Sequence, residues 1–170
     1  MLTIRQGQPA DLSRVMTIYA LARQRMREAG NPGQWGETYP PQALIEEDIA
    51  AGRCRVAVED GVIRAVFALC TGREPTYEVI EQGAWPDDLP YVTLHRVATD
   101  GVRRGVFAEI AAWSRGQAER VRIDTHERNL PMRRVIERSG FTYCGVIHVE
   151  DGTPRRAYQW TAGGEEPAHE

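Results

Sequence analysis

The stretch ATDGVRRGVFAEIAAW, residues 98–113, joins the end of an apolar segment to an amphipathic one. Its pattern predicts a strand that passes into a helix near residue 105. The first N–H groups of any helix lack carbonyl partners and carry partial positive charge, and a glycine lets an anion approach them. Arg103 and Arg104 add formal charge beside Gly105. The joint therefore predicts either a phosphate site or an ordinary helix start with two solvated arginines.

Outward from this joint, hydrophobic periodicity and turn residues predict one mixed α/β domain over residues 1–160 and a disordered tail over 161–170. The predicted order of elements is β-α-α-β-β-β-α-β-α-β-β. Asp-Gly pairs at 60–61 and 151–152 predict hairpin turns, and residues 72–89 form an irregular insertion. The strands that flank the helix at 105–118 are predicted to be parallel neighbours, because a right-handed crossover joins them. Strands are predicted at 2–6, 53–59, 62–69, 90–98, 121–125, 141–150 and 155–160, and helices at 10–29, 41–51, 105–118 and 129–139.

Composition excludes several classes of function. The net charge of −3 argues against binding to nucleic acid or to an anionic membrane surface. All 21 basic side chains are arginines, so a catalytic or phosphate-binding lysine is excluded. Cys54, Cys70 and Cys144 lie in apolar stretches, without spacing that suggests a metal site, and are predicted to be buried thiols in a reducing compartment. With no signal peptide and no long apolar run, the sequence predicts a cytoplasmic protein.

A second stretch, RIDTHERNLPMRRVIERSGFTYCGVI at residues 122–147, reads as a strand, a turn, a helix and another strand. Asn129 is a favourable N-cap residue, and Pro131 suits the first turn of the helix. Gly140 is suited to end the helix, and Phe141 begins the next strand. These residues have structural reasons for their positions whether or not the stretch carries a function.

Together the two stretches resemble the GNAT N-acetyltransferase superfamily, in particular a bacterial subgroup of small proteins, over roughly residues 2–160. The resemblance implies a mixed, mostly antiparallel twisted sheet flanked by helices, with acetyl-CoA as the acetyl donor. It implies that the loop after the central strand holds the diphosphate of coenzyme A and that the helix after Asn129 lies beside the cofactor. The implied cofactor-binding residues are Val97, Ala98, Thr99, Arg103, Arg104, Gly105, Val106, Asn129 and Met132.

Two positions depart from the family pattern. The family loop follows Arg/Gln-x-x-Gly-x-Gly/Ala; a window at 102–107 matches only Gly105, and one at 103–108 has Val106 in place of a glycine. Phe107 would crowd a diphosphate unless it turns into the core. The family often carries a tyrosine acid in the last helix, where this chain has Ile136, and Tyr143 is either a substitute acid or an ordinary strand aromatic.

The remaining candidates for the catalytic base are two histidines, with the loop carboxylates Glu37 and Glu127 as weaker alternatives. A base must accept the amine proton, and histidine suits this role because its reference pKa is about 6.5. His95 lies on the strand that precedes the loop, and His126 follows the next strand. Each is a candidate base or an ordinary hydrogen-bonded histidine. A backbone N–H within 97–99 is implied to polarise the acetyl carbonyl.

The acceptor is expected to bind where the segment QWGETYP, residues 34–40, meets the 72–89 insertion. Aromatic side chains in these loops either wall an acceptor pocket or pack as small satellite cores; they are Trp35, Tyr39, Tyr77 and Trp85. Acidic residues in the same loops, among them Glu37, Asp87 and Asp88, would attract a cationic amine.

The sequence therefore predicts an N-acetyltransferase that moves an acetyl group to a small amine or amino-acid-like acceptor, with no metal. One alternative is a GNAT-fold protein that binds an acyl-CoA without turnover, and another is a structural domain that has lost the cofactor. A homodimer is one assembly that the sequence allows.

Overall fold

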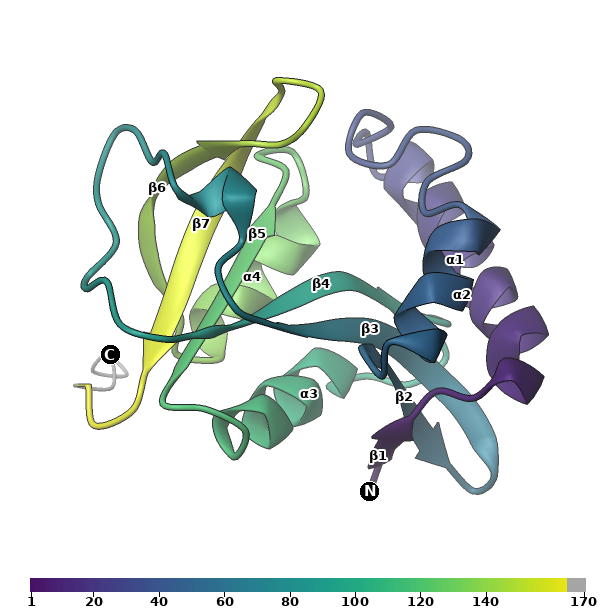
Figure 1. Cartoon of the computed structure of the whole chain (residues 1–170). Coiled ribbons are helices and arrows are strands. Elements are labelled where there is room, and N and C mark those ends of the chain that lie inside the picture. The colour runs from purple at the N-terminus through teal and green to yellow at the C-terminus, as the bar shows by residue number, and fades with distance from the viewer. Residues whose placement is uncertain (165–170) are drawn as a thin grey trace. The chain divides into compact units, whose positions relative to one another are not determined.

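The computed structural model describes residues 1–164 (Figure 1). Its order of strands and helices is the predicted β-α-α-β-β-β-α-β-α-β-β. The strands are β1 (Thr3–Gln6), β2 (Cys54–Glu59), β3 (Val62–Thr71), β4 (Val92–Thr99), β5 (Arg120–Thr125), β6 (Thr142–His148) and β7 (Pro154–Thr161). The helices are α1 (Leu12–Glu28), α2 (Gln42–Ala50), α3 (Val106–Arg115) and α4 (Leu130–Arg138), with 3-10 turns η1 (Pro9–Asp11) and η2 (Pro75–Tyr77).

The described strands form a mixed sheet in the order β1-β2-β3-β4-β5-β7-β6. Strands β4 and β5 run parallel, with Val92 opposite Val121, which confirms the predicted crossover through α3. The pairs β1–β2, β2–β3, β5–β7 and β6–β7 are antiparallel, which confirms both hairpins. Asp60 and Gly61 at the first turn have positive φ angles of 51° and 76°, as a tight two-residue hairpin requires.

The chain folds into two compact units. The first contains Met1–Cys70 and Leu94–Ile110, and the second contains Thr71–Thr93 and the chain from Ala111 onward. The single domain over 1–160 stays a prediction. Thr161, the first residue of the expected disordered tail, pairs with Arg120 as the end of β7, and residues 165–170 of that tail lie outside the described residues.

In the first unit, α1 and α2 pack against each other, and α2 packs against β2 (Figure 1). The buried face of α1 carries Val15, Ile18, Tyr19 and Ala22 at helical spacing, as the sequence predicts. The same core contains Ile45, Cys54, Val56, Ile63, Val66 and Ala98. The end of β4 is thereby held by a close-packed core on the side that leads into the loop at 100–105.

In the second unit, the 72–91 segment is more ordered than the predicted irregular insertion. Glu81 and Val146 exchange backbone hydrogen bonds of 2.8 Å, so the segment adds a β-bridge to β6. Gly83 allows this close approach, because a Cβ there would lie 2.0 Å from the carbonyl oxygen of Cys144. The core beneath this segment contains Tyr77, Tyr91, Ile147 and Ala157, with Trp85 partly buried against it.

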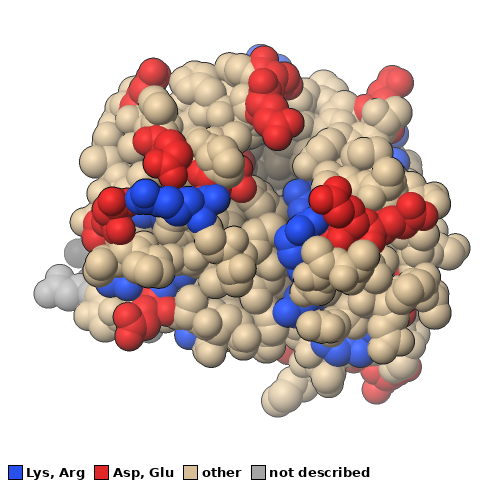
Figure 2. All heavy atoms as spheres, in the orientation of Figure 1, with Lys and Arg blue, Asp and Glu red and all other residues tan. Residues whose placement is uncertain are grey.

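Every helix within residues 1–164 is too short or too polar to cross a lipid bilayer. In that same part of the chain, no group of three or more histidine, cysteine, aspartate or glutamate side chains is arranged to hold a metal ion. No disulfide joins the cysteines; Cys54 and Cys144 are buried as predicted, whereas Cys70 is only partly buried. On the face drawn in Figure 2, arginines and carboxylates lie next to one another.

Candidate functional site

The joint between β4 and α3 is a tight loop over residues 100–105. Gly101 and Gly105 have φ angles of 76° and 75°, a conformation that favours glycine. The helix begins at Val106, and the first turn of α3 presents N–H groups that have no carbonyl partner within the helix. A Cβ at Gly105 would meet no atom within 4 Å, so space lies beside the backbone at the helix start. A helix start with open space beside its backbone is a kind of place where proteins bind anions.

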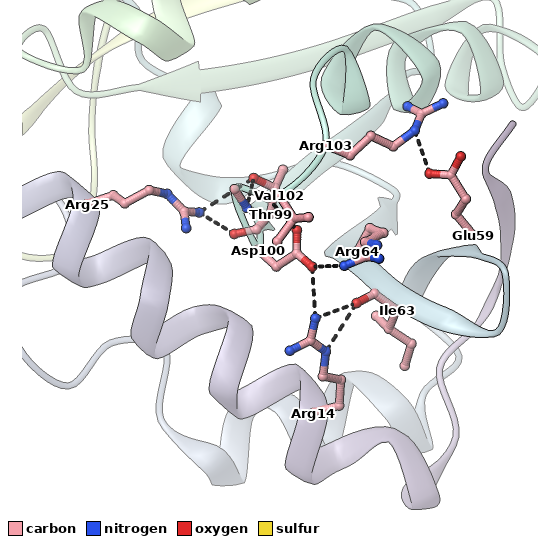
Figure 3. A network of polar contacts seen from close by, with 10 residues as sticks. Arg14, Arg25, Glu59, Ile63, Arg64, Thr99, Asp100, Val102 and Arg103 are labelled. Atoms are coloured by element: carbon pink, nitrogen blue, oxygen red, sulfur yellow. Dashed lines mark hydrogen bonds and ion pairs between the residues drawn. The ribbon is translucent and has the colours of Figure 1, made fainter.

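A buried carboxylate fixes the entry to this loop (Figure 3). Asp100 Oδ2 accepts hydrogen bonds from Arg14 Nη2 at 2.9 Å and from Arg64 Nη1 at 3.0 Å. Its other oxygen accepts the N–H of Val102 at 3.0 Å. Both oxygens are thus occupied, and the carboxylate ties α1 and β3 to the first turn of the loop. Sequence reasoning missed Asp100, because its partners are distant in the chain.

The two arginines predicted to bind phosphate differ in their surroundings. Arg103 Nε lies 2.6 Å from Glu59 Oε2 (Figure 3). Nη1 of the same guanidinium contacts Glu109. The backbone N–H of Leu2 and the guanidinium of Arg103 hold the pKa of Glu109 below its usual value. Arg103 is therefore already engaged by two carboxylates, whereas Arg104 is exposed to solvent.

Phe107 is 6% exposed and packs into the core, so it does not crowd the backbone at the helix start. Val106 is buried as well, at 3%. The apolar residues that break the family's glycine pattern therefore turn inward.

A further arginine reaches the loop from α1. Arg25 Nη2 donates to the backbone oxygen of Thr99 and lies 3.5 Å from its hydroxyl (Figure 3). A Cβ at Gly101 would lie 2.8 Å from Arg25 Nη1, so the glycine makes room for the guanidinium. The sequence offered no signal for this contact beyond the presence of another arginine on a predicted helix.

The predicted acceptor aromatics of the first unit are in contact. The ring centroid of Trp35 lies 6.2 Å from that of Tyr39. It lies 5.7 Å from the ring centroid of Tyr19, in an edge-on arrangement. Trp35 is partly buried, and Tyr39 is 39% exposed. The exposed edge of this cluster can contact a ligand, and its inner edge is part of the core around Tyr19.

Strand β4 carries a second buried ion network next to His95. Arg96 has a φ angle of 52° and binds Asp48 through two hydrogen bonds of 2.9 Å. Burial opposes its charge, but Asp48 together with the hydroxyls of Tyr39 and Tyr19 raises the pKa of Arg96. The carbonyl of Arg96 accepts the hydroxyl of Tyr19 at 2.8 Å. This unusual backbone conformation distorts the strand between His95 and Val97, both of which are partly buried.

In the second unit, Asn129 caps α4 as predicted, because its side chain accepts the N–H of Met132 at 3.3 Å. Asn129 and Met132 are both partly buried. Gly140, at the end of the helix, has a φ of 87°. Ile136 is fully buried, so the position at which the family resemblance implies a tyrosine faces the core of this unit.

His126 lies in the turn that precedes α4. Its Nδ1 accepts the N–H of Arg128 at 3.0 Å, so the neutral ring carries its proton on Nε2. Burial, and then the nearby charges of Arg155 and Arg128, lower the pKa of His126. The ring is neutral at pH 7, but its lone pair is already used by the backbone, which disfavours a role as base.

The insertion's aromatics form an ordered cluster. Tyr77 is 2% exposed, and its hydroxyl donates to Asp124 Oδ2 at 2.6 Å. Burial, reinforced by Asp124, raises the pKa of Tyr77. Trp85 stacks on the guanidinium of Arg122 at 3.9 Å and lies 5.2 Å from the Tyr77 ring. The buried ring of Tyr77 thus packs against Trp85, and Trp85 is the more accessible of the two.

Acidic residues of the insertion are also engaged. Asp87 pairs with Arg120 at 2.9 Å, and Asp88 contacts Arg73. Tyr143 is 37% exposed on β6, with the guanidinium of Arg156 4.1 Å above its ring.

Comparison with solved structures identifies the chain. A crystal structure of a GNAT-family acetyltransferase from Streptococcus agalactiae shares 30% sequence identity, covers 96% of each chain and superposes with a TM-score of 0.88. The chain belongs to the GNAT family of acetyltransferases. No protein-family model matches the sequence, and a search of curated proteins finds no match.

More distant members share the GNAT fold. A Bacillus subtilis acetyltransferase in complex with CoA is 14% identical, with a TM-score of 0.63 over 95% of this chain and 99% of its own. The structure of yncA from Salmonella typhimurium with its cofactor acetyl-CoA is 17% identical, with a TM-score of 0.60 over 98% of this chain and 96% of its own. The assignment of the chain to a small bacterial subgroup of this family stays a prediction.

Proposed function

We propose that this GNAT protein transfers an acetyl group from acetyl-CoA to the amine of a small molecule or an amino-acid-like acceptor. The observation that carries the proposal is the anion-binding geometry of the 100–105 loop in a chain of this family. Relatives of the same fold that hold CoA or acetyl-CoA support it. The expected location is the cytoplasm, and a homodimer is one expected assembly.

The proposed reaction is a direct attack in a ternary complex. The neutral amine nitrogen attacks the thioester carbon, the C–S bond breaks, the nitrogen loses one proton and the sulfur gains one. Holding both substrates in contact supplies much of the acceleration. A backbone N–H within the segment Val97, Ala98 and Thr99 would polarise the acetyl carbonyl. Arg96, with its positive φ, directly precedes this segment, so the distortion of β4 would affect the direction of these N–H groups.

Between the two histidines, His95 is the stronger candidate for the base. His126 Nδ1 already accepts a backbone N–H, so protonation at that nitrogen would break a hydrogen bond. His95 lies on β4 directly before the distorted residue Arg96. His95→Gln should lower turnover by about 100-fold or more, within the range for general bases, whereas His126→Gln should change it by less than about threefold.

For the acceptor, Trp35 and Tyr39 would provide an aromatic surface in the first unit, and Trp85 one in the second. Because Asp87 and Asp88 are paired with arginines, exposed Glu37 is the more available carboxylate for a cationic amine. We expect small primary amines with apolar or aromatic groups to be the best acceptors.

For protonation of the thiolate, Tyr143 is the candidate acid, since Ile136 has no acidic group. Tyr143→Phe removes only the hydroxyl. A loss of turnover below about threefold, under about 0.7 kcal/mol, would mean that water protonates the sulfur instead.

The test is release of thiol from acetyl-CoA across a panel of amines, together with thermal unfolding in the presence of CoA. Ligand binding raises the unfolding temperature by mass action. An increase with acetyl-CoA and amine-dependent thiol release are expected. A rise in unfolding temperature without turnover would favour a non-catalytic acyl-CoA-binding protein, for which buried Ile136 is the favouring observation. No rise with either ligand would favour a structural domain.

A further inference from the structure

The arginines around the 100–105 loop are not equivalent as ligands for a phosphate. Arg14 and Arg64 share the carboxylate of Asp100. Arg103 contacts Glu59 and Glu109. Each of these three guanidiniums already faces a carboxylate, and a phosphate would have to compete with that partner for its charge. Arg104 is exposed to solvent, so water screens its charge.

Arg25 is held differently. Its hydrogen bonds go to the carbonyl and hydroxyl oxygens of Thr99, and within residues 1–164 none of its contacts is with a carboxylate (Figure 3). A guanidinium has five N–H donors, and those at Nη1 and Nε are not used by Thr99. Arg25 is also partly buried, so its charge is less screened by water than that of a solvated surface arginine.

The position of Arg25 relative to the loop backbone supports a role in binding. The N–H groups of Gly101 and Val102 already donate to Thr99 Oγ1 and Asp100 Oδ1, at 3.3 Å and 3.0 Å. The donors that remain for an anion are therefore those that follow, toward the start of α3. Nη1 of Arg25 lies over Gly101, at the opposite end of the same short loop.

We propose that Arg25 binds the diphosphate of coenzyme A, together with the N–H groups at the start of α3. Planar guanidinium groups bind phosphate through paired, charge-assisted hydrogen bonds. The inference rests on the proposed function, because it names the residue that holds that cofactor. It is also consistent with glycine at position 101, where a Cβ would lie 2.8 Å from Arg25 Nη1 in its present position.

The experiment compares Arg25→Gln with Arg23→Gln by equilibrium titration with CoA and with dephospho-CoA, which lacks the 3′-phosphate. Glutamine retains an N–H donor for Thr99 and removes the charge. Arg23 lies on the same helix and donates to the carbonyl of Tyr39, so it controls for the loss of one positive charge from α1. Thermal unfolding without ligand establishes that both variants are folded.

Arg25→Gln should weaken binding of both ligands by the same factor, about 10-fold to 100-fold, as expected for a lost charge-assisted contact. The dissociation constants of Arg23→Gln should stay within about twofold of those of the unmodified protein. Arg103→Gln should lose less affinity than Arg25→Gln. Equal losses for the Arg25 and Arg23 variants, or a loss with CoA alone, would overturn the assignment to the diphosphate. If the unmodified protein binds neither ligand, the proposed function itself fails, and this inference fails with it.

Discussion

Replacement of Asp100 by asparagine should destabilise the protein through the loop that leads into α3. The Asp100 side chain is 2% exposed and accepts bonds from two guanidiniums and one backbone N–H. Removing one partner of a fully buried ion pair costs about 3–5 kcal/mol. The side chains of Arg14 and Arg64 are 36% and 25% exposed, so water compensates for part of the loss. Asparagine also keeps an acceptor for Val102, which leaves a cost of about 2 kcal/mol.

The assay is thermal unfolding, in which about 2 kcal/mol corresponds to a fall of about 4–8 °C for a chain of this size. Asp88→Asn is the matched control, because Asp88 is 89% exposed and pairs with an exposed arginine, so its midpoint should not change measurably. An Asp100→Asn midpoint within about 1 °C of the unmodified protein would refute the reasoning.

Thiol labelling of the folded protein at mildly alkaline pH should modify Cys70 first, because burial raises the pKa of Cys54 and of Cys144 to about 11; peptide mapping that found either buried thiol labelled first would be contrary to this. Because the pKa of His126 is lower in the folded state than its usual value of about 6.5, stability should be complete above that pH and fall as pH drops below it. Denaturant unfolding across this pH range should show that His126→Gln loses less free energy of unfolding on acidification than the unmodified protein. An equal loss in the two proteins would exclude His126 as the cause. Asn129→Ala should cost about 1 kcal/mol by loss of the cap, and no change in denaturant midpoint would argue against it.

The fold was largely predictable because each element has a local signal. The two Asp-Gly turns mark the hairpins, and both pair as expected. The buried face of α1 follows its helical spacing. The helix at α4 carries its cap and its terminal glycine in the sequence itself. The family resemblance, confirmed by the Streptococcus agalactiae relative, added the arrangement of the sheet.

The side-chain partners at the loop were not predictable, because they depend on contacts between distant residues. The sequence around Arg103 predicts a guanidinium that is free to bind phosphate, yet this guanidinium forms ion pairs with Glu59 and Glu109. Arg25 meets Thr99, 74 positions further along the chain. Local patterns determine which elements form, whereas packing decides which arginines remain available to a ligand.

For the aromatic residues in the predicted acceptor loops, too, the sequence does not show which side chains are buried and which are exposed. Tyr77 and Trp85 lie in one insertion, but only the position of Asp124 on β5 explains why Tyr77 turns inward. Trp35 and Tyr39 belong to a short loop and contact each other, as local proximity favours. Their part in acceptor binding stays a prediction.

The most direct test of the central claim is mass spectrometry of an amine mixture incubated with the protein and acetyl-CoA, with released thiol quantified in the same sample. The account predicts at least one amine that gains a single acetyl group, in an amount equal to the thiol released, and no product when acetyl-CoA is omitted. Binding of acetyl-CoA without any acetylated amine, or thiol release with no acetylated product, would contradict acetyl transfer as the function.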